Sequence, residues 1–210
     1  MKKLFTKILL LISLAVSVQV FADENTVLMF IREGSRNLEV MLEEEVQLMK
    51  DMLEAEGYQV EIATVDGEDL QAGSVSIAVN HKIADVDMDD FGAIALPCMA
   101  PPPGSPYEEE VVQLVQLAAA SDKPIAASRG AVGYLAEAGV LQGKRYAYAS
   151  PVNVEERPSF RGGTFTGTGT ETDGLVTTNG ICPLASRSTG LPDGTGAMTR
   201  SFIETLNSRS

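Results

Sequence analysis

The stretch KPIAASRGAVGYLAEAGVLQGK, residues 123–144, decides the fold. Its short apolar run, Pro124–Ala127, stops at Ser128-Arg129-Gly130, and a helix-like pattern then continues to Gly139. A buried strand that enters a helix through so tight a turn is typical of α/β enzymes that present a nucleophile from a sheet. The turn therefore predicts a functional position, and Ser128 is the candidate nucleophile.

Strand-like and helix-like patterns alternate on both sides of this turn. Alternating elements of this kind predict an α/β sandwich with a mostly parallel sheet covered on both faces, in a single domain. The expected strands are Thr26–Ile31, Tyr58–Val65, Ser74–Asn80, Phe91–Pro97, Pro124–Ala127 and Leu175–Asn179, with a hairpin in the Thr/Gly-rich segment Gly162–Gly174. The expected helices are Leu38–Gly57, Tyr107–Ala120, Ala131–Ala138 and Thr195–Leu206.

Sites in such sheets form in the crevice at the carboxyl ends of the strands. The loops expected to line this crevice are Glu33–Glu39, Cys98–Gly104, Ser128–Gly130 and Asn179–Pro183. The rest of the chain is expected to be scaffold.

The N-terminal residues have the pattern of an export signal. Lys2, Lys3 and Lys7 precede the apolar run Ile8–Val18, and Val20-Phe21-Ala22 places small residues where a signal peptidase reads. We expect residues 1–22 to be removed after Ala22, leaving a single domain, 23–210, in the periplasm or outside the cell. An uncleaved membrane anchor is the alternative, although the run is short for a span and no cysteine follows for a lipid anchor.

The charge of the chain excludes some partners. Removing the signal's three lysines from the 16 basic residues leaves 13 against 29 acidic ones, a net charge near −16. Such a surface disfavours nucleic acid and, once the signal is cleaved, anionic membranes. One histidine, His81, and two cysteines far apart in sequence predict no metal site, and nothing in the sequence indicates a cofactor.

Several motifs in this order resemble the ThiJ/PfpI family, the parkinsonism-associated deglycase and intracellular-protease-like group of the class I glutamine amidotransferase-like superfamily. The segments that carry the resemblance are LMFIREGSRNLEVML (28–42), LEAEGYQVEIATVDG (53–67), FGAIALPCMAPPPG (91–104), residues 123–144 and DGLVTTNG (173–180). The resemblance implies a flavodoxin-like three-layer fold, in a protein that is often a homodimer.

The resemblance also implies where the site residues should lie. The family's strand–helix turn, or elbow, usually reads Ala-Ile-Cys-His-Gly, and the matching residues here place Ser128 at the cysteine and Arg129 at the histidine, followed by Gly130. The family's glutamate from the first strand–helix loop matches Glu39, and its oxyanion-pocket glycines match Cys98 and Met99. A second histidine used by some members would fall near Ser150-Pro151 and is absent.

These replacements remove the family's usual chemistry. A serine hydroxyl needs a positioned base, Arg129 cannot accept a proton, and a carboxylate such as Glu39 is a weak base for a serine. Ser128 would otherwise be a small residue that fits a tight turn, Glu39 a partner of loop amides, and Arg129 a partner of an acidic group. Cys98 and Cys182 each follow a strand, so either a disulfide across the crevice or two free thiols is expected.

Three functions remain open. The first is a family member without cysteine catalysis, a pseudoenzyme whose pocket binds a small molecule or a protein, with Arg129 holding an anion. The second is a hydrolase or amidase that uses Ser128, assisted by Glu39 and the amides of Cys98 and Met99. The third is a redox-responsive protein that uses Cys98 and Cys182.

Overall fold

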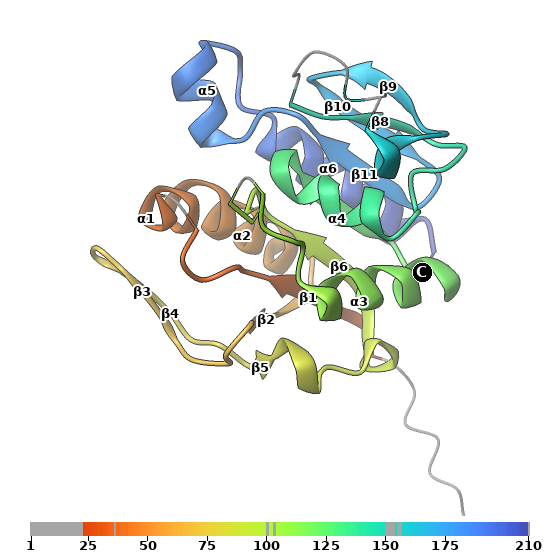
Figure 1. Ribbon diagram of the computed structural model, residues 1–210. Coiled ribbons are helices and arrows are strands. Elements are labelled where there is room, and N and C mark those ends of the chain that lie inside the picture. The colour runs from red at the N-terminus through yellow and green to blue at the C-terminus, as the bar shows by residue number, and fades with distance from the viewer. Residues whose placement is uncertain are drawn as a thin grey trace, which may run out of the picture.

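Seven strands form a central sheet in the order β10-β11-β7-β6-β1-β2-β5. The computed structural model describes residues 23–35, 37–99, 101–102, 104–149, 154 and 157–209 (Figure 1). All neighbouring strands of this sheet are parallel except β10 and β11. The strands are β1 (Asp23–Phe30), β2 (Gln59–Thr64), β5 (His81–Lys82), β6 (Phe91–Leu96), β7 (Ile125–Ser128), β10 (Thr170–Asp173) and β11 (Val176–Asn179). The predicted mostly parallel, flavodoxin-like α/β fold is confirmed.

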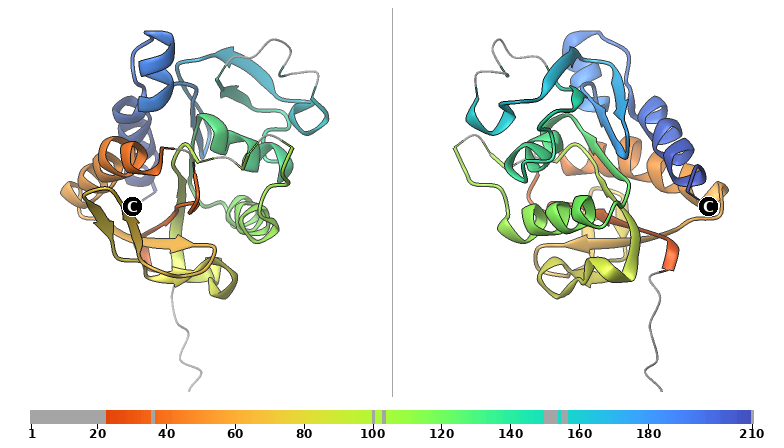
Figure 2. Two further views of the ribbon diagram at one scale, coloured as in Figure 1. Left: turned by 60° about the vertical axis from the view of Figure 1, so that its left-hand side comes forward. Right: turned by 90° about the vertical axis from the view of Figure 1, so that its right-hand side faces the viewer.

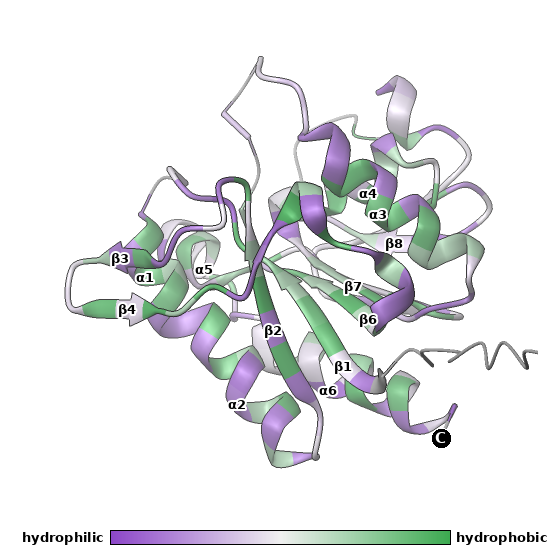
Figure 3. Cartoon of the chain, turned by 90° about the horizontal axis from the view of Figure 1, so that it is seen from below, coloured by the Kyte–Doolittle hydropathy of each residue, from purple (hydrophilic) through white to green (hydrophobic). Residues whose placement is uncertain are grey.

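Helices cover both faces of the sheet, and alternation along β1 explains how. Leu28 and Phe30 belong to the core beneath α3 (Glu109–Ala120) and α4 (Val132–Glu137), whereas Val27 and Met29 face the core beneath α2 (Gln47–Ala55) and α6 (Thr195–Asn207). Side chains that alternate between faces are the signature of a strand buried on both sides. Figure 3 shows the result, with predominantly apolar central strands and α2 striped polar and apolar.

The first helical segment is interrupted by a wider turn. The sequence predicts one helix from Leu38 to Gly57, and the structure contains α1 (Leu38–Met41), a π-helical turn (Leu42–Val46) and then α2. A π turn inserts an extra residue into the helix, and such turns occur frequently at functional sites. Here the turn contains Glu45, which is buried.

The predicted hairpin within Gly162–Gly174 is wrong in its pairing. Its first half, β9 (Thr164–Gly167), pairs in parallel with β8 (Arg145–Ala147), and its second half, β10, pairs with β11. The hairpin that does form is β10–β11, which turns at Gly174 with φ 63°.

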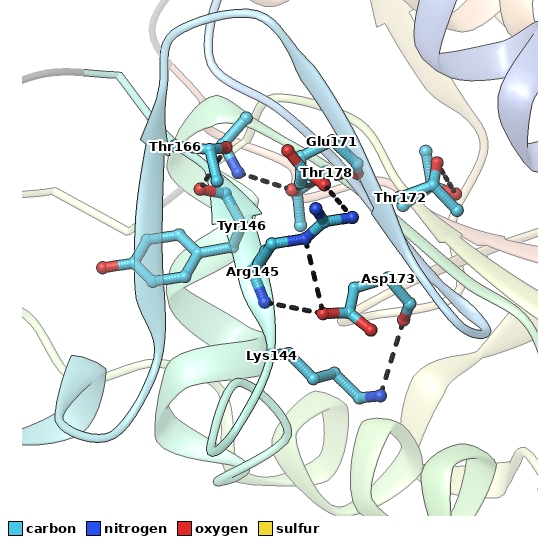
Figure 4. Close-up of polar contacts among 10 residues, drawn as sticks. Lys144, Arg145, Tyr146, Thr166, Glu171, Thr172, Asp173 and Thr178 are labelled. Carbon is cyan, nitrogen blue, oxygen red and sulfur yellow. Dashed lines mark hydrogen bonds and ion pairs between the residues drawn. The ribbon is translucent and has the colours of Figure 1, made fainter.

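Polar contacts fix the small β8–β9 sheet beside the central sheet (Figure 4). Thr178 of β11 accepts a hydrogen bond from the Ala147 amide at 2.8 Å, and the Arg145 amide donates to Asp173 at 2.9 Å. The Arg145 guanidinium also lies 3.0 Å from Glu171. Because a buried amide without a partner is costly, the Thr178 hydroxyl contributes directly to this attachment.

Two further elements differ from the sequence prediction. The expected strand Ser74–Asn80 is shorter, β4 (Val75–Ile77), and pairs with β3 (Leu70–Ala72) in a hairpin outside the central sheet. The views in Figures 1 and 2 show this hairpin and the β8–β9 sheet at opposite ends of the molecule. A short helix that the sequence analysis missed, α5 (Pro183–Thr189), follows β11.

The predicted signal, residues 1–22, lies outside the described residues, as does the pair Ser150-Pro151. Strand β1 begins at Asp23, the residue after the expected cleavage point. Among the residues that the structure describes, no helix is long and apolar enough to cross a membrane.

Candidate functional site

Three neighbouring strands, β6, β7 and β11, end at the same edge of the sheet and bring together residues distant in sequence. In the register of β7 and β11, Ser128 pairs with Asn179, and the Asn179 amide nitrogen donates to the Ser128 hydroxyl at 3.5 Å. Cys98 follows β6, and Cys182 follows β11. Three of the four predicted crevice loops therefore meet, as expected for the carboxyl ends of parallel strands.

Cys98 and Cys182 are the central pair of this site. Their sulfur atoms lie 2.8 Å apart, in hydrogen-bond contact, although 84 positions separate them in sequence. Both are free thiols, Cys98 half-buried and Cys182 fully buried. The loops thus bring the two thiols within bridging distance, and formation of the disulfide stays a prediction.

The two thiols differ in their electrostatic surroundings. The pKa of Cys182 is lowered to about 7 by its hydrogen bond with Cys98, against the effect of burial, and also by the Ala185 and Leu184 amides and by Arg129. The pKa of Cys98 is raised well above its usual value by the hydrogen bond with Cys182, and then by burial and by the charge of Glu45. The thiolate is the reactive form of cysteine. In this pair Cys182 is the sulfur that ionises near neutral pH.

Glu45 is the carboxyl group of the site. It is fully buried, and its Oε2 accepts a hydrogen bond from the Cys98 amide at 3.0 Å. Its Oε1 has no partner at hydrogen-bond geometry among the described residues. The pKa of Glu45 is raised to about 8, mainly by burial and also by the charges of Cys182 and Asp193, while hydrogen bonds from the Ser128 hydroxyl and the Cys98 amide act in the opposite direction.

The prediction that Glu39 contacts this site is wrong. Glu39 is exposed, and its carboxylate lies against Gly73 in the turn of the β3–β4 hairpin. The signal for Glu45 was present in the sequence: it lies four residues after Met41 and four before Met49, on the apolar stripe of the helix. The other two residues of the acidic run 43–45, Glu43 and Glu44, are exposed.

Ser128 is not at the apex of the turn, which corrects the assignment made from the motif. It is the last residue of β7, with extended backbone (φ −105°, ψ 129°) and no exposed surface. The left-handed residue is Arg129, with φ 42°. A strained residue between strand and helix marks the elbow position, so Arg129 stands where a nucleophile would be expected.

The expected oxyanion pocket at Cys98 and Met99 is also contradicted. The Cys98 amide donates to Glu45, and the Met99 amide donates to the carbonyl of Pro97 at 2.6 Å. Neither amide is therefore directed at a substrate oxygen. The Gly130 amide instead hydrogen-bonds the Cys98 sulfur and lowers the pKa of that thiol.

The histidine of this chain lies away from the site. The chain's single histidine, His81, lies on the edge strand β5, where it contacts Glu61 at 2.5 Å and packs edge-on against Phe91. Ser128 consequently has no imidazole base, and its hydroxyl is buried. The arrangement can perform thiol chemistry, proton exchange with Glu45 and cation binding.

Comparisons with known proteins agree with the architecture. The model of the DJ-1/PfpI family matches residues 25–182. A ThiJ/PfpI domain protein from Brachyspira murdochii has 18% identity and a TM-score of 0.64, with 89% of this chain and 98% of that one covered. The putative protease I from Bacteroides thetaiotaomicron has 16% identity and a TM-score of 0.62, with coverage of 87% and 99%.

A DJ-1 superfamily protein from Agrobacterium tumefaciens is similar to the same extent, with 18% identity, a TM-score of 0.62, and coverage of 86% of this chain and 98% of that one. At these identities, the structural likeness shows the fold alone. Among curated proteins, none matches the sequence significantly.

Proposed function

Because the chain belongs to the DJ-1/PfpI family, we propose that it is a thiol-redox member in which Cys98 and Cys182 form a reversible disulfide. The observation that carries this proposal is the 2.8 Å contact between the two sulfurs. We propose this redox chemistry in place of a serine nucleophile at the elbow, because the elbow position holds Arg129 and Ser128 is buried without an imidazole base.

The reaction is a thiol–disulfide exchange with an external small-molecule disulfide. Cys98 has the higher pKa of the two thiols, but it is the half-buried one and therefore the one that an external disulfide can reach. Its thiolate attacks one sulfur of that disulfide and releases one thiolate. The Cys182 thiolate then attacks Cys98 in the mixed disulfide and releases the second thiolate. The pair loses two electrons and two protons, and the external disulfide takes up both and leaves as two thiols.

Single-cysteine variants test the order of these steps, with oxidised glutathione as the oxidant. Cys182→Ser should accumulate a glutathione adduct on Cys98, because the second attack is lost. Cys98→Ser should remain unmodified, because Cys182 is fully buried. The wild type should lose two hydrogen atoms and retain no glutathione by intact mass. A stable adduct on wild-type protein would contradict the proposal, provided that circular dichroism shows all three proteins folded.

Ligand binding at Arg129 is a second candidate. The Arg129 side chain is half-buried at the turn, and its Nε has no hydrogen-bond partner among the described residues. A small carboxylate would supply one. Titration with acetate by calorimetry tests this use: Arg129→Ala should abolish a heat of binding that Ser128→Ala retains, and no binding to wild type would exclude acetate-like ligands.

We also propose that the protein is exported, on the N-terminal pattern of residues 1–22 and on the chemistry of the site. Disulfides form and persist in oxidising compartments outside the cytosol. N-terminal sequencing of the periplasmic or secreted fraction of expressing cells should find a chain that begins at Asp23. Recovery of chains that retain Met1, with none processed, would contradict export.

A further inference from the structure

Three metal-ligand atoms lie together at the site although the sequence predicted no metal site. One carboxylate oxygen of Glu45 and the sulfurs of Cys98 and Cys182 all lie within 4.8 Å of one another. Thiolates with a carboxylate are donors that suit Zn²⁺, which takes four ligands and in open sites takes three from the protein. Cysteine spacing could not reveal this set, because its members come from three separate segments.

The carboxylate supplies an observation independent of the thiols. Glu45 is fully buried, and in the part of the chain that the structure describes its Oε1 has no partner at hydrogen-bond geometry. A buried polar atom without a partner is rare and costly, and a bound ion is one of its explanations. A cation between Oε1 and the two sulfurs would supply the missing interaction.

Charge and size are also compatible with a divalent cation. Two thiolates and one carboxylate carry three negative charges, so a divalent ion leaves one, and Arg129 interacts electrostatically with Cys182. Tetrahedral ligation with Zn–S bonds of about 2.3 Å places two sulfurs about 3.8 Å apart. The two sulfurs, now 2.8 Å apart, must therefore separate by roughly 1 Å more. Rotation of the two side chains can provide this without a change of fold.

We propose that Glu45, Cys98 and Cys182, in the reduced state, form a binding site for a thiophilic divalent cation of the Zn²⁺ class. The fourth position is open to water on the side of Cys98, the half-buried member. The inference uses the same sulfurs as the redox proposal but a different state of them. A disulfide removes both thiolate ligands, so oxidation and metal binding exclude each other.

The experiment is a Zn²⁺ titration of the reduced mature chain against a chromophoric chelator. We expect one Zn²⁺ per chain and none for the disulfide form. Glu45→Gln should weaken binding about 10-fold to 100-fold or more, since even partners outside the first ligand shell contribute that much. Glu39→Gln is the matched control, because this exposed glutamate belongs to the preceding helical turn and should leave the affinity unchanged. Cys98→Ser and Cys182→Ser should bind more weakly still.

A second readout needs no variant. Stoichiometric Zn²⁺ should slow alkylation of both thiols in wild-type protein, and a chelator should restore it. A reduced wild type that takes up no Zn²⁺ would overturn the metal site, and its disulfide would still form if the redox proposal holds. Zn²⁺ binding without disulfide formation would overturn the redox proposal alone. Equal affinity in Glu45→Gln and wild type would overturn the three-donor site.

Discussion

Glu45 is a buried carboxyl group, and its titration should appear in the stability of the protein. Its pKa is about 8 in the folded chain, above its ordinary 4.5. Folding therefore favours the protonated form: the stability this provides is fully present below about pH 4.5 and is lost as the pH rises through about 8. The side chain that replaces Glu45 in the variant Glu45→Gln stays neutral at every pH. The unfolding free energy of this variant should therefore fall less between pH 5 and pH 9 than that of wild type. The difference should be a few kcal/mol, because one pKa unit corresponds to about 1.4 kcal/mol.

Urea unfolding of the reduced proteins, with a metal chelator present, measures this difference. Glu39→Gln is the control and should follow the wild-type curve, because the Glu39 side chain is exposed. Parallel pH dependences for Glu45→Gln and wild type would show that Glu45 is ionised in the folded protein across this range.

Arg129 has its own predicted effect on the thiols. Its charge lowers the pKa of Cys182. Arg129→Gln should therefore shift the appearance of the first thiolate, followed by its ultraviolet absorbance, to higher pH, whereas Arg129→Lys should shift it less. Identical titrations for wild type and Arg129→Gln would mean that the guanidinium does not act on the pair.

At the scale of single residues, the sequence identified the segments that form the site but, at two positions, the wrong residue. The turn at 128–130 was predicted as functional, but the left-handed backbone falls on Arg129 rather than Ser128. A carboxylate was expected beside the turn, but that place is taken by Glu45, a buried residue of the π turn. The left-handed backbone at Arg129 is a detail that residue spacing alone does not encode, whereas the spacing of Glu45 from Met41 and Met49 does indicate its buried position.

At the scale of elements, the β11–α5 connection holds Cys182 in place, and Gly180 is its tightest point. A Cβ atom at Gly180 would lie 2.6 Å from the carbonyl oxygen of Tyr148 and 2.7 Å from the backbone of Thr168. Since backbone atoms cannot rotate away, Gly180→Ala should cost about 1–3 kcal/mol or more of unfolding free energy. It should also slow disulfide formation by displacing Cys182.

Gly169→Ala is the matched control for this substitution. Gly169 accepts the hydrogen bond of the Gly180 amide at 3.1 Å, yet a Cβ atom there would meet nothing within 4 Å. Its unfolding free energy should stay close to wild type in denaturant titration. If both alanine variants were equally stable, the close approach at Gly180 would not be a constraint.

Elements with a strong apolar period were predictable, and short polar ones were not. Strands β1, β6 and β7 and helices α3 and α6 follow from runs that are buried on one or both faces. The Thr/Gly-rich segment offers no such pattern, so its alternation could not tell which neighbour each half would pair with. Register in such segments is set by tertiary partners.

At the scale of the whole molecule, the cysteine pair joins the end of β6 to the start of α5 across the sheet. A bond between positions 84 apart in sequence restricts a long loop in the unfolded chain. On the chain-entropy model it would stabilise the protein by about 4–5 kcal/mol, less any strain in the folded state. The fold itself was predictable from alternating elements, but the contact between these thiols arises only when the three strands β6, β7 and β11 are assembled.

The contact between Cys98 and Cys182 is tested most directly by counting free thiols. The mature wild-type chain, first reduced, is equilibrated with oxidised dithiothreitol, quenched with an alkylating agent and weighed intact. We predict no alkyl groups on the oxidised monomer and two after renewed reduction, with one cross-linked peptide pair containing both cysteines. Two alkyl groups on folded protein after prolonged oxidation would contradict the account.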